Sequence, residues 1–94
     1  MLFKLEKLSL DEDKDSMVPS GYSVTGNILY LYDYKTDEKE VIRGIEGVKT
    51  GWQVVLAGLR DHIRTSPIKE IIYRTPTWVK FRTQTSVYLL TKVE

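Results

Sequence analysis

The sequence predicts an α+β fold, in which a small, bent, mostly antiparallel sheet of five to six strands packs against one amphipathic helix. Two observations lead to it. Residues 50–64 carry apolar side chains at helical spacing, whereas the rest of the chain consists of short apolar segments bounded by turn residues. The expected order is four strands, the helix and three further strands, forming a single compact domain over residues 1–94.

The helix is predicted from apolar residues spaced three and four apart, namely Trp52, Val55, Leu56, Leu59 and Ile63. Thr50 and Gln53 fit a capping box at its start, and Pro67 follows its end. Gly58 falls in the middle, where glycine costs about 1 kcal/mol relative to alanine. Close approach of another backbone, within the chain or across a dimer, would explain a glycine at that position, and evolutionary drift is the alternative.

The first strand is expected over residues 2–10, where apolar and polar residues alternate. An acidic loop follows, and its residues Asp11, Asp13 and Asp15 imitate the first ligands of a calcium loop. The sixth position of such a loop is glycine and the twelfth glutamate, but here they are Ser16 and Tyr22. No metal site is therefore expected.

A three-stranded meander is expected next. Gly26-Asn27 separates residues 22–25 from residues 28–34, which is typical of a two-residue hairpin that pairs Val24 with Leu29. A second turn at residues 35–38 leads to a further strand.

Within the meander, Tyr30, Tyr32 and Tyr34 form a stripe at period two, and the second turn brings Val41 opposite Tyr32. Such a stripe either packs across the strands or, if exposed, stacks on bases or holds a partner peptide. Cross-strand packing is the simpler interpretation.

The C-terminal part is expected to form a strand over residues 68–73 and a hairpin of residues 78–82 with residues 86–90. A three-residue loop pairs Arg82 with Ser86 and collects the apolar residues on one face. The other face then presents aromatic and basic side chains. With their neighbours, the expected binding residues are Lys69, Arg74, Trp78, Lys80, Arg82, Tyr88 and Lys92.

Composition narrows the classes of function. The chain has no cysteine and one histidine, His62, so thiol chemistry and a conventional zinc site are not expected. No serine lies in a GxSxG context, and the paired carboxylates fall in loops. We therefore expect a non-enzymatic, cytoplasmic protein without a cofactor or a membrane span.

The charge is uneven along the chain. Residues 1–47 hold six basic and ten acidic residues, a net charge of −4, whereas residues 48–94 hold eight and three, a net charge of +5. Such polarity either marks a surface for a charged partner or is neutralised within the fold.

Nucleic acid is the leading expected partner, because rings stack on bases and lysine or arginine meets phosphates. The alternative is a protein-binding accessory or inhibitor domain, of the kind found in phages or mobile elements. Its surface would be the acidic loop or the tyrosine stripe: Asp11, Asp13, Asp15, Tyr30, Tyr32 and Tyr34. The sequence is compatible with a monomer or a homodimer, and an enzyme is the third interpretation.

Overall fold

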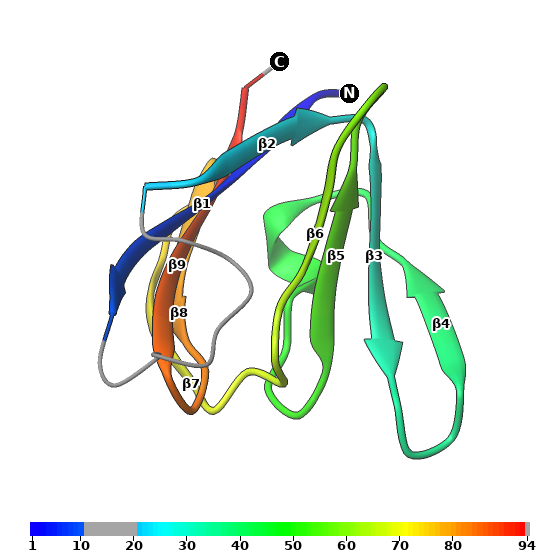
Figure 1. Cartoon of the computed structure of the whole chain (residues 1–94), viewed down its shortest axis with the longest axis vertical. Helices are drawn as coiled ribbons and strands as arrows, with labels where there is room; N and C mark the ends of the chain where they lie inside the picture. The colour runs from blue at the N-terminus through cyan, green and yellow to red at the C-terminus, as the bar shows by residue number, and fades with distance from the viewer. Residues whose placement is uncertain (11–20, 94) are drawn as a thin grey trace.

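Two antiparallel sheets face each other across a shared core in the computed structural model, which describes residues 1–10 and 21–93. Within this part the chain forms nine strands, one 3-10 turn and no α-helix. The predicted α+β class is therefore wrong, and the fold is all-β (Figure 1). The strands are β1 (Phe3–Leu10), β2 (Ser23–Gly26), β3 (Ile28–Asp33), β4 (Glu38–Val41), β5 (Gln53–Ala57), β6 (His62–Arg64), β7 (Glu70–Arg74), β8 (Trp78–Arg82) and β9 (Ser86–Lys92).

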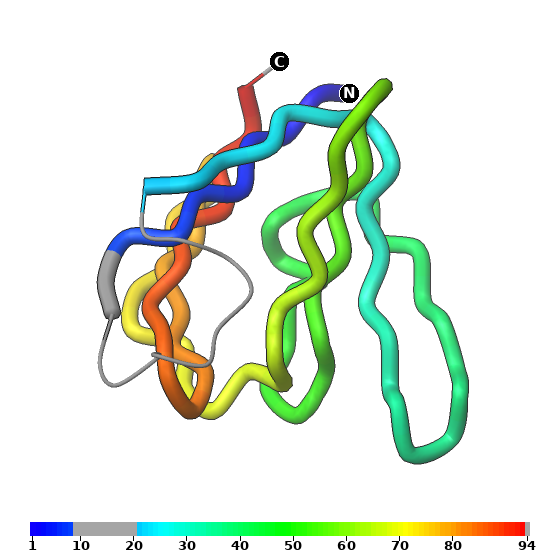
Figure 2. The backbone as a smooth tube through the Cα atoms, viewed as in Figure 1, coloured from blue at the N-terminus to red at the C-terminus, as the bar shows by residue number. Residues whose placement is uncertain are grey.

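The chain begins and ends in the same sheet and forms the other sheet in between. One sheet has five strands in the order β2-β1-β9-β8-β7, and the other has four in the order β4-β3-β5-β6. The backbone passes from the first sheet to the second between β2 and β3 and comes back after β6 (Figure 2). The 3-10 turn η1 (Ile45–Gly47) lies between β4 and β5.

The segment predicted as a helix is a β-hairpin, β5 followed by β6. Its three central residues Val54, Val55 and Leu56 are all buried, so the apolar run has no single face and fits a helical period by coincidence. Leu59, which the helical stripe placed on the buried side, is fully exposed in the turn between the two strands.

The hairpin predicted about Gly26-Asn27 is also absent, because β2 pairs with β1 whereas β3 pairs with β4 and β5. Gly26 is instead the corner where the chain changes sheets. A Cβ on Gly26 would overlap the carbonyl oxygen of Ala57, and one on Gly58 would overlap the carbonyl oxygen of Thr25. Both glycines are required by the close approach of two backbones.

The β3–β4 hairpin is confirmed, with a register two residues away from the predicted one. Val41 lies opposite Tyr30 in place of Tyr32. Because the shift is two residues, each side chain keeps the face that the sequence predicted.

The β8–β9 hairpin is confirmed too, but its register differs by one residue from the predicted one. Arg82 pairs with Val87, and the amide of Thr83 donates to the carbonyl of Ser86 at 2.9 Å. A one-residue shift exchanges the faces of a strand. Tyr88, predicted on the outer face, is consequently turned into the core, where 3% of it is exposed.

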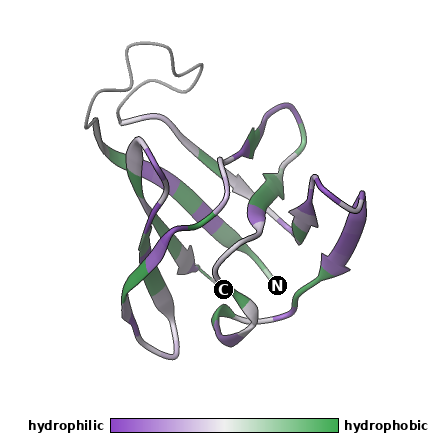
Figure 3. Ribbon diagram, turned by 90° about the horizontal axis from the view of Figure 1, so that it is seen from below, coloured by the Kyte–Doolittle hydropathy of each residue, from purple (hydrophilic) through white to green (hydrophobic). Residues whose placement is uncertain are grey.

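The core fills the space between the sheets. In β2 and β6 buried apolar residues alternate with outward polar ones, and hydrophobic and hydrophilic colours both occur along the strands in Figure 3. The five-stranded sheet contributes Phe3, Leu5, Val24, Val79, Phe81, Tyr88 and Leu90, and the four-stranded sheet contributes Leu29, Leu31, Val54, Leu56 and Ile63. The connecting segments add Ile42, Ile45, Val48 and Ile68.

Candidate nucleic-acid interface

The outer face of the five-stranded sheet is built around β8. Val79 and Phe81 are fully buried, so Trp78, Lys80 and Arg82 alternate with them and point away from the core. The sequence predicted this placement, and the structure confirms that the three side chains share one face.

Trp78 is held in place by its turn and by a neighbouring ring. The amide of Trp78 donates to the hydroxyl of Thr75 at 3.0 Å, and the amide of Thr75 donates to the carbonyl of Trp78 at 2.8 Å. The ring of Tyr73 lies 5.5 Å from that of Trp78, centroid to centroid, at an interplanar angle of 35°. Aromatic pairs at this separation are mutually stabilising, so the indole is pre-positioned.

Tyr73 was not predicted as a site residue. A register irregularity between Ile71 and Tyr73 places Tyr73 opposite Lys80, on the outer face, where 61% of it is exposed. We call the surface formed by Tyr73, Trp78, Lys80 and Arg82 the β8 face. No pattern in the sequence indicates the irregularity, because the apolar run of β7 has no clear alternation.

A shallow groove of about 290 Å³ lies beside Trp78 on the same side of the sheet. Its lining combines apolar and polar side chains: Leu8, Trp78, Lys80, Leu89 and Thr91. Leu89 is on this face because of the same one-residue register shift that buries Tyr88. The β8 face is therefore bordered by a partly apolar hollow.

The cations of the β8 face differ in their partners. Arg82 forms an ion pair with Glu70 at 3.2 Å, and both side chains are about half exposed. Exposed pairs of this kind contribute about 0–1 kcal/mol, so a phosphate competes with the carboxylate at little cost. Lys80 forms no ion pair with another described residue.

Three of the predicted binding residues lie away from this face. Tyr88 is in the core, where its ring stacks on that of Phe81 with the centroids 5.5 Å apart. Arg74 donates to the carbonyls of Ile45 and Val48, at 2.9 Å and 2.5 Å, and so ties β7 to the 3-10 turn. Lys92 shares the face of Tyr88 at the exposed end of β9.

Lys69, the remaining predicted residue, lies where β8 ends. Its amide donates to the carbonyl of Arg82 at 2.7 Å, and its exposed side chain lines a pocket next to the β8–β9 loop. Lys69 is therefore adjacent to the β8 face without being part of it.

The two tyrosines of β3, Tyr30 and Tyr32, lie on the outer face of the four-stranded sheet. A cation covers each ring: Lys39 Nζ is 5.6 Å from the centroid of Tyr30, and the Arg64 guanidinium is 5.9 Å from that of Tyr32. We call these four residues the tyrosine face. Tyr34 leaves the stripe and lines the same pocket as Lys69.

Tyr32 has a further partner at the tip of the β3–β4 hairpin. Its hydroxyl donates to a carboxylate oxygen of Asp37 at 2.5 Å. This hydrogen bond raises the pKa of Tyr32 above its ordinary value, because ionising the phenol would break the bond and set two negative charges together.

The other residues that the sequence singled out add little to the description of a candidate site. Asp11, Asp13 and Asp15 lie outside the described residues, and His62 is exposed on β6. Among residues 1–10 and 21–93, no three histidine, aspartate or glutamate side chains lie close enough to share a metal ion. The same residues include no helix long and apolar enough to span a membrane.

The geometry therefore provides one face with uncovered rings between cations, the β8 face, and one whose rings are covered by cations, the tyrosine face. Comparison with family models, with curated proteins and with solved structures finds no match for the chain.

Proposed function

We propose that this protein binds single-stranded nucleic acid along the β8 face, without catalysing a reaction on it. The observation that carries the proposal is the adjacent pair of rings, Tyr73 and Trp78, on the solvent side of the sheet beside Lys80 and Arg82. Unstacked bases pack on such rings with about 1–3 kcal/mol each, and the neighbouring cations meet the phosphates.

The tyrosine face is the less suitable platform. Its rings are already covered by Lys39 and Arg64, so a base would have to displace a cation before stacking. No lysine or arginine is found over Tyr73 or Trp78 among the described residues. Base stacking at the β8 face has no such cost.

Single strands are favoured over duplexes because rings reach the faces of bases only when the bases are unstacked. The groove beside Trp78 offers apolar contact to a base or sugar next to the stacked one. Contacts of this kind read little sequence, so a modest sequence preference is expected.

The test is fluorescence anisotropy of labelled single- and double-stranded oligonucleotides at several salt concentrations. Trp78→Ala should weaken single-strand binding by about 5- to 150-fold, the equivalent of one stacked base. Lys80→Ala should reduce the slope of log K against log salt by about 0.7, the value for one phosphate of a single strand.

Lys39→Ala is the matched control, because it removes the same charge from the outer face of the other sheet. It should leave the slope almost unchanged. Absence of binding at low salt, or equal losses from Lys39→Ala and Lys80→Ala, would contradict the proposal.

A protein partner is the second candidate, and one observation favours it. A groove of about 440 Å³ runs beside β4, an edge strand, and its lining includes the exposed apolar residues Met1, Ile28 and Val41. An extended segment of a partner pairs readily with such an edge. Val41→Lys would abolish this mode while leaving oligonucleotide binding intact.

A protein partner held by the acidic loop makes a different prediction. Neutralising Asp11, Asp13 and Asp15 would abolish its binding, and Lys80→Ala would have no effect on it. For nucleic acid the same neutralisation should strengthen binding, because it removes three negative charges from the protein.

A further inference from the structure

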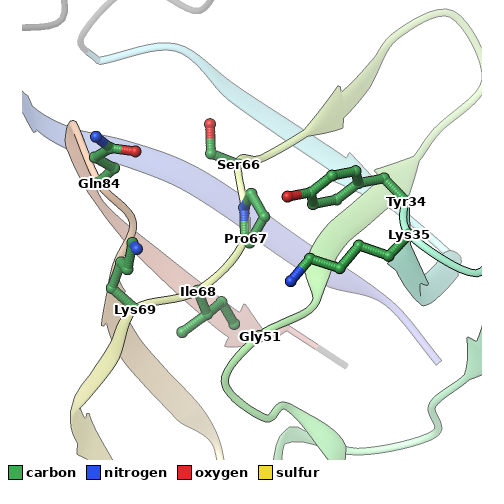
Figure 4. Close-up of a pocket in the computed structure, with 8 residues that line it drawn as sticks. All are labelled: Tyr34, Lys35, Gly51, Ser66, Pro67, Ile68, Lys69 and Gln84. Carbon is green, nitrogen blue, oxygen red and sulfur yellow. The ribbon is translucent and has the colours of Figure 1, made fainter.

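A second feature of the structure lies beyond the end of β8, at one end of the two sheets. It is a pocket of about 260 Å³ between the end of β3, the segment that precedes β7 and the β8–β9 loop (Figure 4). Its lining is Tyr34, Lys35, Gly51, Ser66, Pro67, Ile68, Lys69 and Gln84. We call it the end pocket.

The floor of the end pocket is fixed by backbone hydrogen bonds. The amide of Gly51 donates to the carbonyl of Ile68, and the amide of Ile68 donates to the carbonyl of Trp52, both at 2.9 Å. Gly51 has a φ of 88°, a conformation that favours glycine. Part of the pocket wall is therefore hydrogen-bonded backbone.

The side chains around this floor are hydrogen-bond donors. Tyr34 and Lys35 reach toward Pro67 from one side, and Lys69 and Gln84 line the other (Figure 4). With the Ser66 hydroxyl they offer two ammonium groups, two hydroxyls and one amide.

The described residues give the pocket a positive charge. None of the described lining residues is acidic, and neither Lys35 nor Lys69 forms an ion pair with another described residue. The carboxylate of Asp33, close by in the chain, accepts a hydrogen bond from the backbone amide of Lys35 at 3.0 Å. The two ammonium groups are thus available to an anion.

The end pocket also continues the β8 face. The backbone of Lys69 is hydrogen-bonded to that of Arg82, the last cation of β8, and Gln84 follows Arg82 in the loop. A strand that runs along β8 from Trp78 toward Arg82 would reach the pocket at its end.

From these observations we infer that the end pocket binds the terminal phosphate of a nucleic-acid strand. A terminal phosphomonoester carries a charge of about −1.5 to −2 at neutral pH, whereas an internal phosphodiester carries a single negative charge. The two lysines therefore match the charge of a terminal phosphate better than that of an internal one. The volume of about 260 Å³ lies just below the roughly 300–1,000 Å³ of pockets for whole small molecules and has room for one phosphate group. The inference rests on the proposed function, whose strand it anchors.

The test compares three oligonucleotides of one sequence, carrying a 5′-phosphate, a 3′-phosphate or no terminal phosphate. One of the phosphorylated forms should bind about tenfold more tightly than the unphosphorylated form, the effect of one charge-assisted hydrogen bond. Lys35→Ala and Lys69→Ala should each remove that preference. Lys92→Ala, which removes a charge at the exposed end of β9, should keep it.

A titration with inorganic phosphate, followed by the amide signals of Gly51 and Lys69, tests the pocket without a strand. Amide shifts that disappear in Lys35→Ala support the end pocket as a phosphate site. If these shifts occur but no oligonucleotide binds, the proposed function fails and the phosphate that the pocket binds belongs to a small molecule. Equal affinity for all three oligonucleotides, with no shift from phosphate, overturns the inference and leaves the proposed function standing if Trp78→Ala still weakens binding.

Discussion

Gly58→Ala distinguishes the two-sheet fold from a helical one by the sign of its effect. In the middle of a solvent-exposed helix the substitution would stabilise the protein by about 1 kcal/mol, because alanine is the better helix former. In the structure Gly58 follows β5 in the tight β5–β6 turn, where a Cβ would overlap the carbonyl oxygen of Thr25 at the end of β2. The same substitution should then destabilise the protein.

The magnitude follows from two opposing contributions. The obstructing carbonyl oxygen belongs to the backbone of Thr25, which is paired with β1 in the five-stranded sheet. Moving it should cost about 1–3 kcal/mol, which is typical of an overpacked site. Alanine recovers about 0.4–1 kcal/mol by restricting the unfolded chain. The net loss should be about 1–2 kcal/mol, which lowers the melting temperature of a domain of this size by about 4–16 °C.

Thermal and urea unfolding, followed by circular dichroism, measure this change. Gly44→Ala is the control, because Gly44 is extended and its Cβ would meet only the flexible carboxylate of Glu46. It should change the free energy of unfolding by less than about 0.5 kcal/mol. A rise in melting temperature for Gly58→Ala would refute the close contact between the β5–β6 turn and the end of β2.

Three further predictions concern the register of β9, the ionisation of Tyr32 and the proposed binding at the β8 face. Tyr88→Ala should destabilise the protein by about 3–5 kcal/mol in urea unfolding, because it empties a core position. The pKa of Tyr32 should fall toward its ordinary value in Asp37→Ala, as measured by ultraviolet titration. Because that pKa is raised by folding, its contribution to stability is present below the ordinary phenol pKa of about 10 and is lost as the pH rises through the raised value. Glu70→Gln should strengthen oligonucleotide binding, because it frees Arg82 and removes a negative charge.

Each of these predictions has a control. Leu89→Ala, one residue along β9 and on the outer face, should cost clearly less stability than Tyr88→Ala; the reverse order would show that the strand register is wrong. An unchanged Tyr32 pKa in Asp37→Ala would show that the hydrogen bond to Asp37 is not what raises it. Unchanged or weaker binding by Glu70→Gln would show that Arg82 takes no part.

The sequence predicted the strand segments at the two ends of the chain better than the element between them. The β8–β9 hairpin has apolar residues at period two, and residues 2–10 mix apolar and polar residues on both faces; both segments form strands, as predicted. Residues 53–57 are buried on both faces, since Val55 on the outer side is flanked by Tyr30 and Arg64 of neighbouring strands. An apolar run that is buried on both faces has no hydrophobic period, so only its tertiary packing determines whether it forms a helix or a strand.

The arrangement of the proposed binding face was predicted only in part, for a related reason. Alternation along β8 correctly places Trp78, Lys80 and Arg82 on one face. The face of Tyr88 depends on the register of the hairpin, in which Arg82 pairs with Val87 in place of Ser86 and the amide of Thr83 donates to the carbonyl of Ser86. Local sequence does not decide between the two registers, and a shift of one residue reverses the face.

The most direct test of the binding face is an amide NMR titration of the full chain with an unlabelled single-stranded oligonucleotide. We predict the largest shifts at the Trp78 indole and at Tyr73, Lys80 and Arg82, with Tyr30 and Tyr32 on the opposite sheet unaffected. Shifts centred on Tyr30 and Tyr32, or none at low salt, would contradict it.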